Sequence, residues 1–152
     1  MTSYNILKSW IISDRESYKD VIENCIENFQ PKQFLGLTGP MGSGKTFFTN
    51  KLIHYYGLNK NVFFQSPSFA LHHHYQNSQI SIDHLDLFRL ENHDELESIG
   101  FWDLFSQDDS LIIVEWADRI NLKLIPKKYN PIIIEFKIEN NIRHCYLKKL
   151  IF

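Results

Sequence analysis

Residues 34–46 decide the fold of this chain and read Phe34-Leu35-Gly36-Leu37-Thr38-Gly39-Pro40-Met41-Gly42-Ser43-Gly44-Lys45-Thr46. The apolar first half is typical of a buried strand, and the glycine-rich second half is typical of a turn that leads into a helix. Gly39, Gly44, Lys45 and Thr46 match the pattern G-x-x-x-x-G-K-[ST], which cradles the phosphates of a nucleoside triphosphate. We therefore predict a strand, a phosphate-binding loop and a helix start, in this order.

The residue types in this loop suit an anionic ligand. Glycine lets the backbone adopt φ > 0 and bring its N–H groups close to an anion. A helix that begins near Lys45 adds the positive end of its dipole. We expect Lys45 to reach the β- and γ-phosphates and Thr46 to ligate Mg²⁺. The G-x-G-x-x-G pattern of dinucleotide folds is not matched, which disfavours dinucleotide binding.

Length and charge restrict the class of protein. The chain has 152 residues, so we expect one domain over residues 1–152. The net charge is −2, and the sequence pI is about 6.4. A protein that grips nucleic acid alone usually carries a basic face, whereas here Lys127-Lys128 and Lys148-Lys149 are only isolated pairs. Any contact with nucleic acid is therefore expected to be indirect.

The cysteines and the N-terminal segment favour a cytoplasmic protein. Cys25 and Cys145 are far apart and form no C-x-x-C motif, so neither a zinc site nor a disulfide framework is expected. Buried free thiols suit a reducing cytosol. The chain does not start with a basic region followed by an apolar one, and no apolar run reaches about 18 residues. We therefore expect no membrane segment.

The remaining pattern predicts alternating strands and helices. Ser13 and Glu16 form the pattern of a capping box, which predicts a helix that starts there and ends before Pro31. The helix after Lys45 is expected to stop at Gly57, and two short helical pieces are expected around Gly100. The other expected strands are 4–12, 61–64, 71–75, 79–87, 111–115, 132–138 and 143–150, with a proline-containing loop at 65–69.

Polar residues within two of these strands bear on a metal site. The run His72-His73-His74 lies on a predicted strand, where successive side chains alternate between faces, so the three cannot converge on one metal ion. We expect a solvated or edge strand there. Asp83 and Asp86 are three residues apart and face opposite ways, so at most one is expected to face the phosphates.

Glu115 is the second expected metal ligand, after Thr46. Residues 111–114 are wholly apolar, as in a parallel strand that is buried on both faces, and Glu115 ends the strand. An acid in this place often helps to hold Mg²⁺ beside a nucleotide. The order of elements predicts a three-layer α/β fold of the P-loop NTPase type, with a mostly parallel sheet that includes antiparallel strands and is flanked by helices.

Three further segments accompany the loop: Ser66-Pro67-Ser68-Phe69, His84-Leu85-Asp86-Leu87-Phe88-Arg89 and Val114-Glu115-Trp116. In order and spacing, all four resemble the motifs of the TsaE family, small bacterial ATPases of tRNA threonylcarbamoyladenosine biosynthesis. The resemblance spans nearly the whole chain. This sequence departs from the family pattern at Ser68, where Thr is usual, at Phe88, where Tyr is usual, and at Ala117, where proline is common.

The resemblance implies a set of site residues. Lys45 and Asp86 would act in catalysis, with Asp86 either orienting the attacking water or completing the magnesium shell. Thr46 and Glu115 would hold Mg²⁺. The implied ATP contacts are Gly42, Ser43, Gly44, Lys45, Thr46, Phe47, Asp86, Trp116, Ala117, Arg143 and Arg15.

The resemblance also implies a function and partners. The chain would hydrolyse Mg-ATP, slowly when alone, and support the TsaD and TsaB proteins in forming threonylcarbamoyladenosine at position 37 of tRNA. The tRNA would be contacted only through that complex, and the isolated chain would be a monomer. The segment 66–69 would sense the γ-phosphate.

Two other functions use the same phosphate loop. A small-molecule kinase needs an acceptor pocket and usually a lid that carries arginine, and the sequence has no such insertion. A guanine-nucleotide switch normally carries Asn-Lys-x-Asp, whereas the pair Asn59-Lys60 continues as Asn61-Val62. The kinase is the main alternative.

Overall fold

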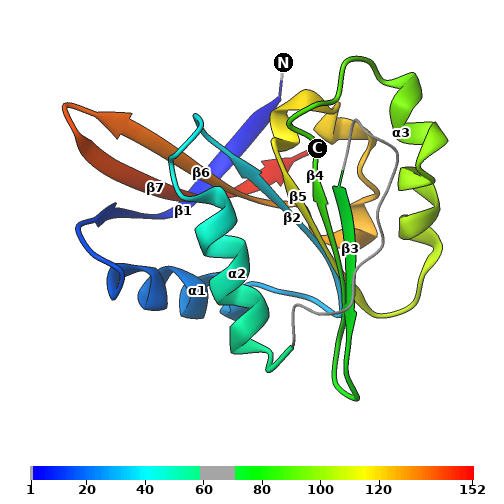
Figure 1. The fold of residues 1–152 in the computed structure, drawn as a ribbon, viewed down its shortest axis with the longest axis horizontal. Helices are drawn as coiled ribbons and strands as arrows, with labels where there is room; N and C mark the ends of the chain where they lie inside the picture. Colours follow the sequence, from blue (N-terminus) through cyan, green and yellow to red (C-terminus); the bar gives the residue numbers. More distant parts are fainter. Residues whose placement is uncertain (1, 59–70) are drawn as a thin grey trace.

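The computed structural model describes residues 2–58 and 71–152, and seven strands of this part form a single mixed sheet (Figure 1). The spatial order is β1-β7-β6-β2-β5-β4-β3. The strands are β1 (Ser3–Ile12), β2 (Lys32–Thr38), β3 (Leu71–Gln76), β4 (Ser81–Asp86), β5 (Ser110–Glu115), β6 (Ile132–Glu139) and β7 (Ile142–Ile151). The strand expected at 61–64 and the loop expected at 65–69 lie outside the described residues.

Helical segments cover both faces of the sheet, as Figure 1 shows. Helices α1 (Ser17–Glu27) and α2 (Lys45–Tyr55) pack on one face, where they share a hydrophobic cluster with β2, β5 and β6. The other face packs against α3 (Asp94–Ser98) and four 3₁₀ segments, η1 (Phe101–Ser106), η2 (Ala117–Arg119), η3 (Leu122–Leu124) and η4 (Lys127–Tyr129). The predicted three-layer α/β fold is therefore confirmed.

The directions of the strands place the predicted site at one edge of the sheet. The neighbours β6, β2, β5 and β4 are parallel, whereas β3 and β7 run in the opposite direction and β1 pairs antiparallel with β7. The parallel strands thus occupy the centre, and antiparallel pairs form both sides. In this register Glu115 lies opposite Leu37 on β2 and opposite Asp86 on β4. The loop that follows β2 and both acids therefore meet at the carboxyl ends of the central strands.

The start of α1 differs from the prediction. The helix begins at Ser17, and no side chain caps it at Glu16. Asp14 instead accepts hydrogen bonds from the backbone N–H and the hydroxyl of Ser17, both at 3.0 Å, while the N–H of Ser13 donates to the Ser17 hydroxyl at 3.4 Å. The prediction that Ser13 and Glu16 form a capping box is therefore wrong. Residues 13–16 form a turn in which the Asp14 carboxylate, and not the Ser13 hydroxyl, accepts the hydrogen bond from the first N–H of the helix.

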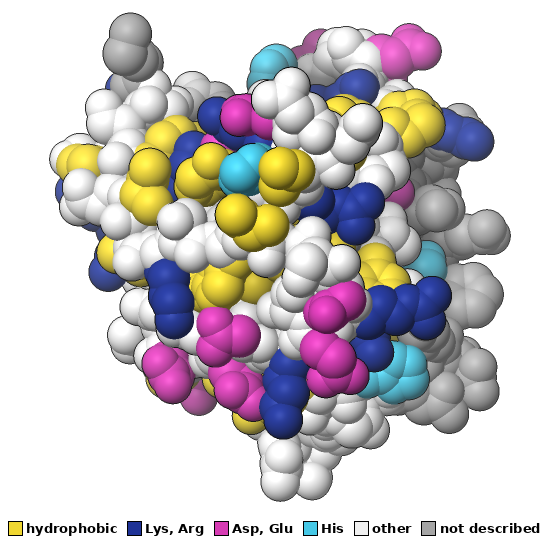
Figure 2. Space-filling model, turned by 90° about the vertical axis from the view of Figure 1, so that its left-hand side faces the viewer, with side chains coloured by type: hydrophobic (Ala, Val, Ile, Leu, Met, Phe, Trp, Pro, Cys, Tyr) yellow, Lys and Arg dark blue, Asp and Glu magenta, His cyan; other side chains and the backbone are white. Residues whose placement is uncertain are grey.

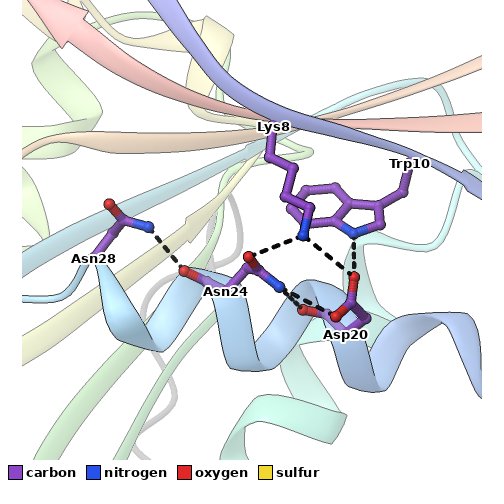
Figure 3. A network of polar contacts seen from close by, with 5 residues as sticks. All are labelled: Lys8, Trp10, Asp20, Asn24 and Asn28. Carbon is purple, nitrogen blue, oxygen red and sulfur yellow. Dashed lines mark hydrogen bonds and ion pairs between the residues drawn. The ribbon is translucent and has the colours of Figure 1, made fainter.

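A polar network fastens α1 to the edge strand β1 (Figure 3). The indole N–H of Trp10 donates to Asp20 at 2.6 Å, and the ammonium of Lys8 donates to the Asn24 side chain at 3.2 Å. Asn24 in turn donates to the Asp20 backbone carbonyl at 2.8 Å, and Asn28 donates to the Asn24 carbonyl at 2.9 Å. These contacts hold α1, whose N-terminal end borders the site described below, against the sheet.

The histidine run lies where the sequence predicted, on the edge strand β3. His72 Nε2 and His74 Nδ1 lie 2.8 and 2.9 Å from the same Asp83 oxygen, whereas His73 lies opposite His84 and on the other face. Asp83 and Asp86 therefore face opposite ways, as predicted. No helix in the described part of the chain is long and apolar enough to cross a membrane.

Candidate nucleotide-binding site

A pocket of about 530 Å³ opens at the N-terminus of α2. It lies between the phosphate-binding loop, the end of β5, the turn before α1 and the β6–β7 hairpin. The predicted site residues that line it are Arg15, Gly42, Gly44, Lys45, Thr46, Phe47, Glu115, Trp116 and Arg143. Residues from four separate parts of the chain thus meet in one cavity.

The loop adopts the backbone conformation that the glycines permit. Gly44 is the N-cap of α2 with φ 113°, and a Cβ built there would run into the Tyr18 hydroxyl. The first α-helical hydrogen bond in α2 runs from the Phe48 N–H to the Gly44 carbonyl at 2.9 Å. The preceding N–H groups of the first turn have no partner within the helix and form its positive end. This arrangement at the pocket suits a phosphate group.

Lys45 is buried beside this loop. Its ammonium donates to the carbonyls of Gly39 at 2.6 Å and Pro40 at 2.9 Å, and it lies 4.0 Å from the centre of the Trp116 ring. Burial lowers the pKa of Lys45, and nearby acids, Glu115 foremost, partly oppose this shift. A cation removed from water in this way interacts strongly with an anion that enters the pocket.

Thr46 and Glu115 form the oxygen pair that the sequence assigned to Mg²⁺. The Thr46 hydroxyl donates to Glu115 Oε1 at 2.7 Å, and His84 Nε2 lies 2.6 Å from Glu115 Oε2. Burial alone would raise the pKa of Glu115, but the hydrogen bonds from His84 and Thr46 and the charge of Lys45 bring it below its ordinary value. Glu115 is therefore held as a carboxylate.

The chemistry of this pair fits magnesium. Mg²⁺ prefers oxygen ligands and is usually held by one or two protein groups together with substrate phosphates. Within residues 2–58 and 71–152, no group of three or more His, Cys, Asp and Glu side chains is placed to hold a metal ion. A threonine hydroxyl and a single carboxylate beside a phosphate-binding loop are the donors expected for Mg²⁺ bound together with a nucleotide.

Asp86 lies next to this pair but does not line the pocket. It is partly buried at the end of β4, opposite Glu115, and its Oδ1 accepts the Phe88 N–H at 3.0 Å. Burial raises the pKa of Asp86, against the hydrogen bond from Phe88 and the charge of Lys45, which lower it. Asp86 is thus the neighbour of Glu115 on the adjacent strand.

Two cationic side chains reach the loop from outside it. Arg143, on β7, donates from Nη2 to the Gly42 carbonyl at 3.1 Å and from Nη1 to the Tyr18 hydroxyl at 3.3 Å. Its Nε is buried and has no hydrogen-bond partner among the residues that the structure describes. The guanidinium of Arg15 lies 5.7 Å from the centre of the Phe47 ring. Both arginines line the pocket, so their positive charges and the loop cradle fit a polyanionic ligand.

Trp116 is held in an unusual backbone conformation after Glu115. Its φ is 61°, in the left-handed region that non-glycine residues seldom adopt. The indole packs against the Arg119 guanidinium at 5.1 Å and the Phe88 ring at 5.2 Å, and it approaches Lys45 at 4.0 Å. It therefore links the pocket to the half-exposed Phe88.

Besides Asp86, two predicted contacts do not line the pocket. The Ser43 side chain is buried, and its hydroxyl has no partner within residues 2–58 and 71–152. The backbone N–H of Ser43 donates to the Pro40 carbonyl at 3.1 Å. Ala117 is fully buried on the far face, where its Cβ would lie 2.8 Å from a Cβ built on Gly36. Its side chain points into the sheet because the left-handed turn at Trp116 redirects the chain.

The sequence reasoning missed pocket residues just before and within the first turn of α1. Ile12, Ser13, Asp14 and Tyr18 line the cavity. Tyr18 belongs to the apolar face of α1, where its ring packs in the core against Phe47 at 4.8 Å between ring centroids. A tyrosine at the first turn of an otherwise aliphatic stripe was the signal available, because its hydroxyl needs a polar neighbour.

Comparisons with known proteins agree with one another. The family described as threonylcarbamoyl adenosine biosynthesis protein TsaE matches residues 12–145. The tRNA threonylcarbamoyladenosine biosynthesis protein TsaE of Rickettsia typhi is 34% identical over 140 residues, which cover 90% of this chain and 91% of that protein. The protein of the same name from Bacillus subtilis is 29% identical over 126 residues, with 83% and 76% covered.

A solved structure supports the fold. The crystal structure of Bacillus subtilus YdiB superposes on this chain with a TM-score of 0.67 at 22% sequence identity. The superposition covers 98% of this chain and 87% of that one. At this identity the likeness concerns the arrangement of helices and strands.

Proposed function

The chain belongs to the TsaE family of threonylcarbamoyl adenosine biosynthesis proteins, and we propose that it serves this pathway as an ATPase that binds and hydrolyses Mg-ATP. The observation that carries the proposal is the Thr46–Glu115 pair, joined at 2.7 Å beside the N-terminus of α2 and open to a pocket of about 530 Å³. These are the donors that a magnesium-bound triphosphate requires beside a phosphate-binding loop.

The residues of the pocket have distinct tasks in this proposal. The N–H groups at the start of α2 bind phosphate oxygens. When the nucleotide binds, the Lys45 ammonium donates to the β- and γ-phosphates in place of the loop carbonyls to which it donates in this structure. Arg143 holds the loop through Gly42 and brings its positive charge to the wall of the pocket. Phe47, between Arg15 and Tyr18, supplies an aromatic wall.

Catalysis then depends on positioning and charge. Mg²⁺, held by Thr46 and Glu115, supplies charge neutralisation at the phosphate oxygens when it is bound. Asp86, one strand away from Glu115, orients the attacking water or completes the magnesium shell. Lys45 adds positive charge that becomes more favourable as the phosphoryl group departs.

We also propose that the TsaD and TsaB proteins are the partners and that ATP hydrolysis drives cycling of their complex as it modifies adenosine 37 of tRNA. The acid-leaning net charge of −2 supports contact with tRNA through these partners. On the face shown in Figure 2, lysines and arginines are interspersed with acidic and hydrophobic side chains, which also suits indirect contact. The two buried free cysteines fit a cytoplasmic location.

The test compares the wild type with Thr46→Val, which removes the hydroxyl but keeps the side-chain shape. We expect magnesium-dependent hydrolysis to fall at least about tenfold, because a ligand of the metal is lost. Thr49→Val is the matched control, because the Thr49 hydroxyl donates to the Lys45 carbonyl inside α2 and does not line the pocket. Equal loss in both variants, or transfer of the phosphoryl group to a metabolite in place of water, would contradict the proposal.

A further inference from the structure

The carboxylate of Glu115 is held at both of its oxygens. Oε1 accepts from the Thr46 hydroxyl at 2.7 Å, and Oε2 lies 2.6 Å from His84 Nε2. An ionised carboxylate can only accept hydrogen bonds, so Nε2 of His84 is the donor. Thr46 belongs to the nucleotide pocket, whereas His84 lies on the neighbouring strand β4 and does not line it.

We propose that His84 is a positioning residue for the magnesium site: its Nε2–H fixes the Glu115 carboxylate so that Oε1 remains directed at Thr46. This inference rests on the proposed function, since it assigns a task within the site that binds Mg-ATP. His84 is not among the described residues that line the pocket, and its hydrogen bond to Glu115 connects it to the site.

The position of His84 in the sheet makes it a rigid anchor. It lies on β4 between the edge strand β3 and the central strand β5, and only 8% of its surface is exposed. In the parallel register His84 pairs with Ile113, two residues before Glu115, so both side chains project from the same face. His73, opposite His84 on β3, packs its ring edge-on at 5.7 Å between centroids. The imidazole is therefore fixed by packing as well as by its hydrogen bond.

Loss of this donor frees the carboxylate to rotate. Glu115 is 1% exposed, so solvent does not replace the missing hydrogen bond on Oε2. Oε1 then has no fixed orientation toward Thr46, and the oxygen pair loses its geometry. Groups that orient a metal ligand in this way typically contribute about 10- to 100-fold in metal affinity. Contacts with the nucleotide made by the loop and by Lys45 do not pass through His84.

Three variants of His84 separate the effect of its hydrogen bond from the effects of side-chain volume and polarity. His84→Gln carries its amide nitrogen the same number of bonds from Cα as Nε2, so it keeps the donor in place. His84→Asn is polar, but its amide ends nearer the backbone and falls short of Glu115. His84→Leu has no donor. His73→Leu is the control, because it removes the neighbouring imidazole, whose Nδ1 lies 3.2 Å from the Tyr75 hydroxyl, and leaves the bond between His84 and Glu115 in place.

The assay is binding of a fluorescent ATP analogue, first in EDTA and then in a magnesium titration, with thermal denaturation to verify folding. We expect similar affinity in EDTA for all variants. The magnesium concentration for half-maximal effect should rise at least about tenfold in His84→Leu and His84→Asn and stay within about threefold of wild type in His84→Gln. If His84→Leu does not fold, the comparison of His84→Gln with His84→Asn tests the role of the hydrogen bond.

The outcomes distinguish this inference from the function on which it rests. Wild-type binding that is insensitive to magnesium would overturn the proposed Mg-ATP site itself. A magnesium-dependent wild type with superimposable His84→Asn and His84→Gln titrations would overturn the role of His84 alone. The same shift in His73→Leu as in His84→Asn would also overturn it, because the effect would then not depend on the bond to Glu115.

Discussion

Replacing Gly44 by alanine tests how closely the phosphate-binding loop depends on α1. Gly44 has φ 113°, and an added Cβ would run into the hydroxyl of Tyr18. The Tyr18 ring cannot simply swing away, because it packs against Phe47 at 4.8 Å and Phe136 at 6.4 Å between ring centroids. The substitution therefore adds a backbone cost and a packing cost.

The two costs have known sizes. A non-glycine residue in a sparsely populated backbone region costs about 1–3 kcal/mol, and overpacking a dense site costs about 1–3 kcal/mol. We expect Gly44→Ala to lower the free energy of unfolding by about 2–6 kcal/mol, a large part of the 5–15 kcal/mol typical of a domain. Gly42→Ala is the control: its φ is 75°, but nothing lies within 4 Å of the built Cβ. Only the backbone cost of about 1–3 kcal/mol applies there.

Urea unfolding of a double-mutant cycle separates the terms. Tyr18→Phe deletes the hydroxyl that the new Cβ would meet and loses its 3.3 Å hydrogen bond from Arg143, which contributes about 1 kcal/mol. In the Tyr18→Phe background, Gly44→Ala should cost about 1–3 kcal/mol less than in the wild type. The reasoning is refuted if Gly44→Ala unfolds at the same urea concentration as Gly42→Ala, or if the two substitutions at 18 and 44 act additively.

Three further predictions concern charge and anchoring. Lys45→Ala should lower steady-state phosphate release at least about tenfold, because charge that assists the departing phosphoryl group is lost; unchanged turnover of the folded variant would contradict this. The pKa of Glu115 is lowered in the folded state, so the ionised carboxylate stabilises the fold at pH values above the ordinary pKa of 4.5. This stabilisation is lost as the pH falls through the folded-state pKa. The stability difference between wild type and Glu115→Gln in urea, with EDTA present, should therefore be constant near neutral pH and shrink below pH 4.5, and a difference that grows on acidification would be contrary. Trp10→Phe removes the 2.6 Å hydrogen bond to Asp20 at the β1–α1 contact and should lower the free energy of unfolding in urea by about 1 kcal/mol. Lys8→Met loses an exposed ion pair of 3.7 Å and should lower it by less than about 0.5 kcal/mol. Equal losses in the two variants would show that the indole hydrogen bond stabilises the fold no more than the ion pair does.

The parts of the fold that the sequence predicted are those with local signals. The loop at 39–46, the strand ending at Glu115 and the β6–β7 hairpin follow from residue types a few positions apart, and the structure has all three. The spatial order of the strands was not readable in this way. Pairing of β1 with β7, from opposite ends of the chain, depends on the tertiary packing of the whole sheet.

The same limit applies to the site. The pocket brings together Lys45, Thr46 and Glu115 because parallel strands end at one edge of the sheet. This rule holds for parallel α/β sheets in general, so the sequence was enough to apply it. The hydrogen bond from His84 to Glu115 was not predicted, since it depends on the register of β4 against β5. Asp14 displaced Ser13 as the group that reaches the start of α1, because the turn before the helix brings its longer side chain to the free N–H.

The most direct test of the central claim is ATP hydrolysis by the purified chain, alone and then with TsaD, TsaB and tRNA from the same organism. We predict slow magnesium-dependent release of phosphate by the chain alone, faster release with all partners present, and multiple turnovers of tRNA modification that require the chain. Hydrolysis that does not change when TsaD, TsaB and tRNA are added, with modification no faster than in the absence of the chain, would contradict the account.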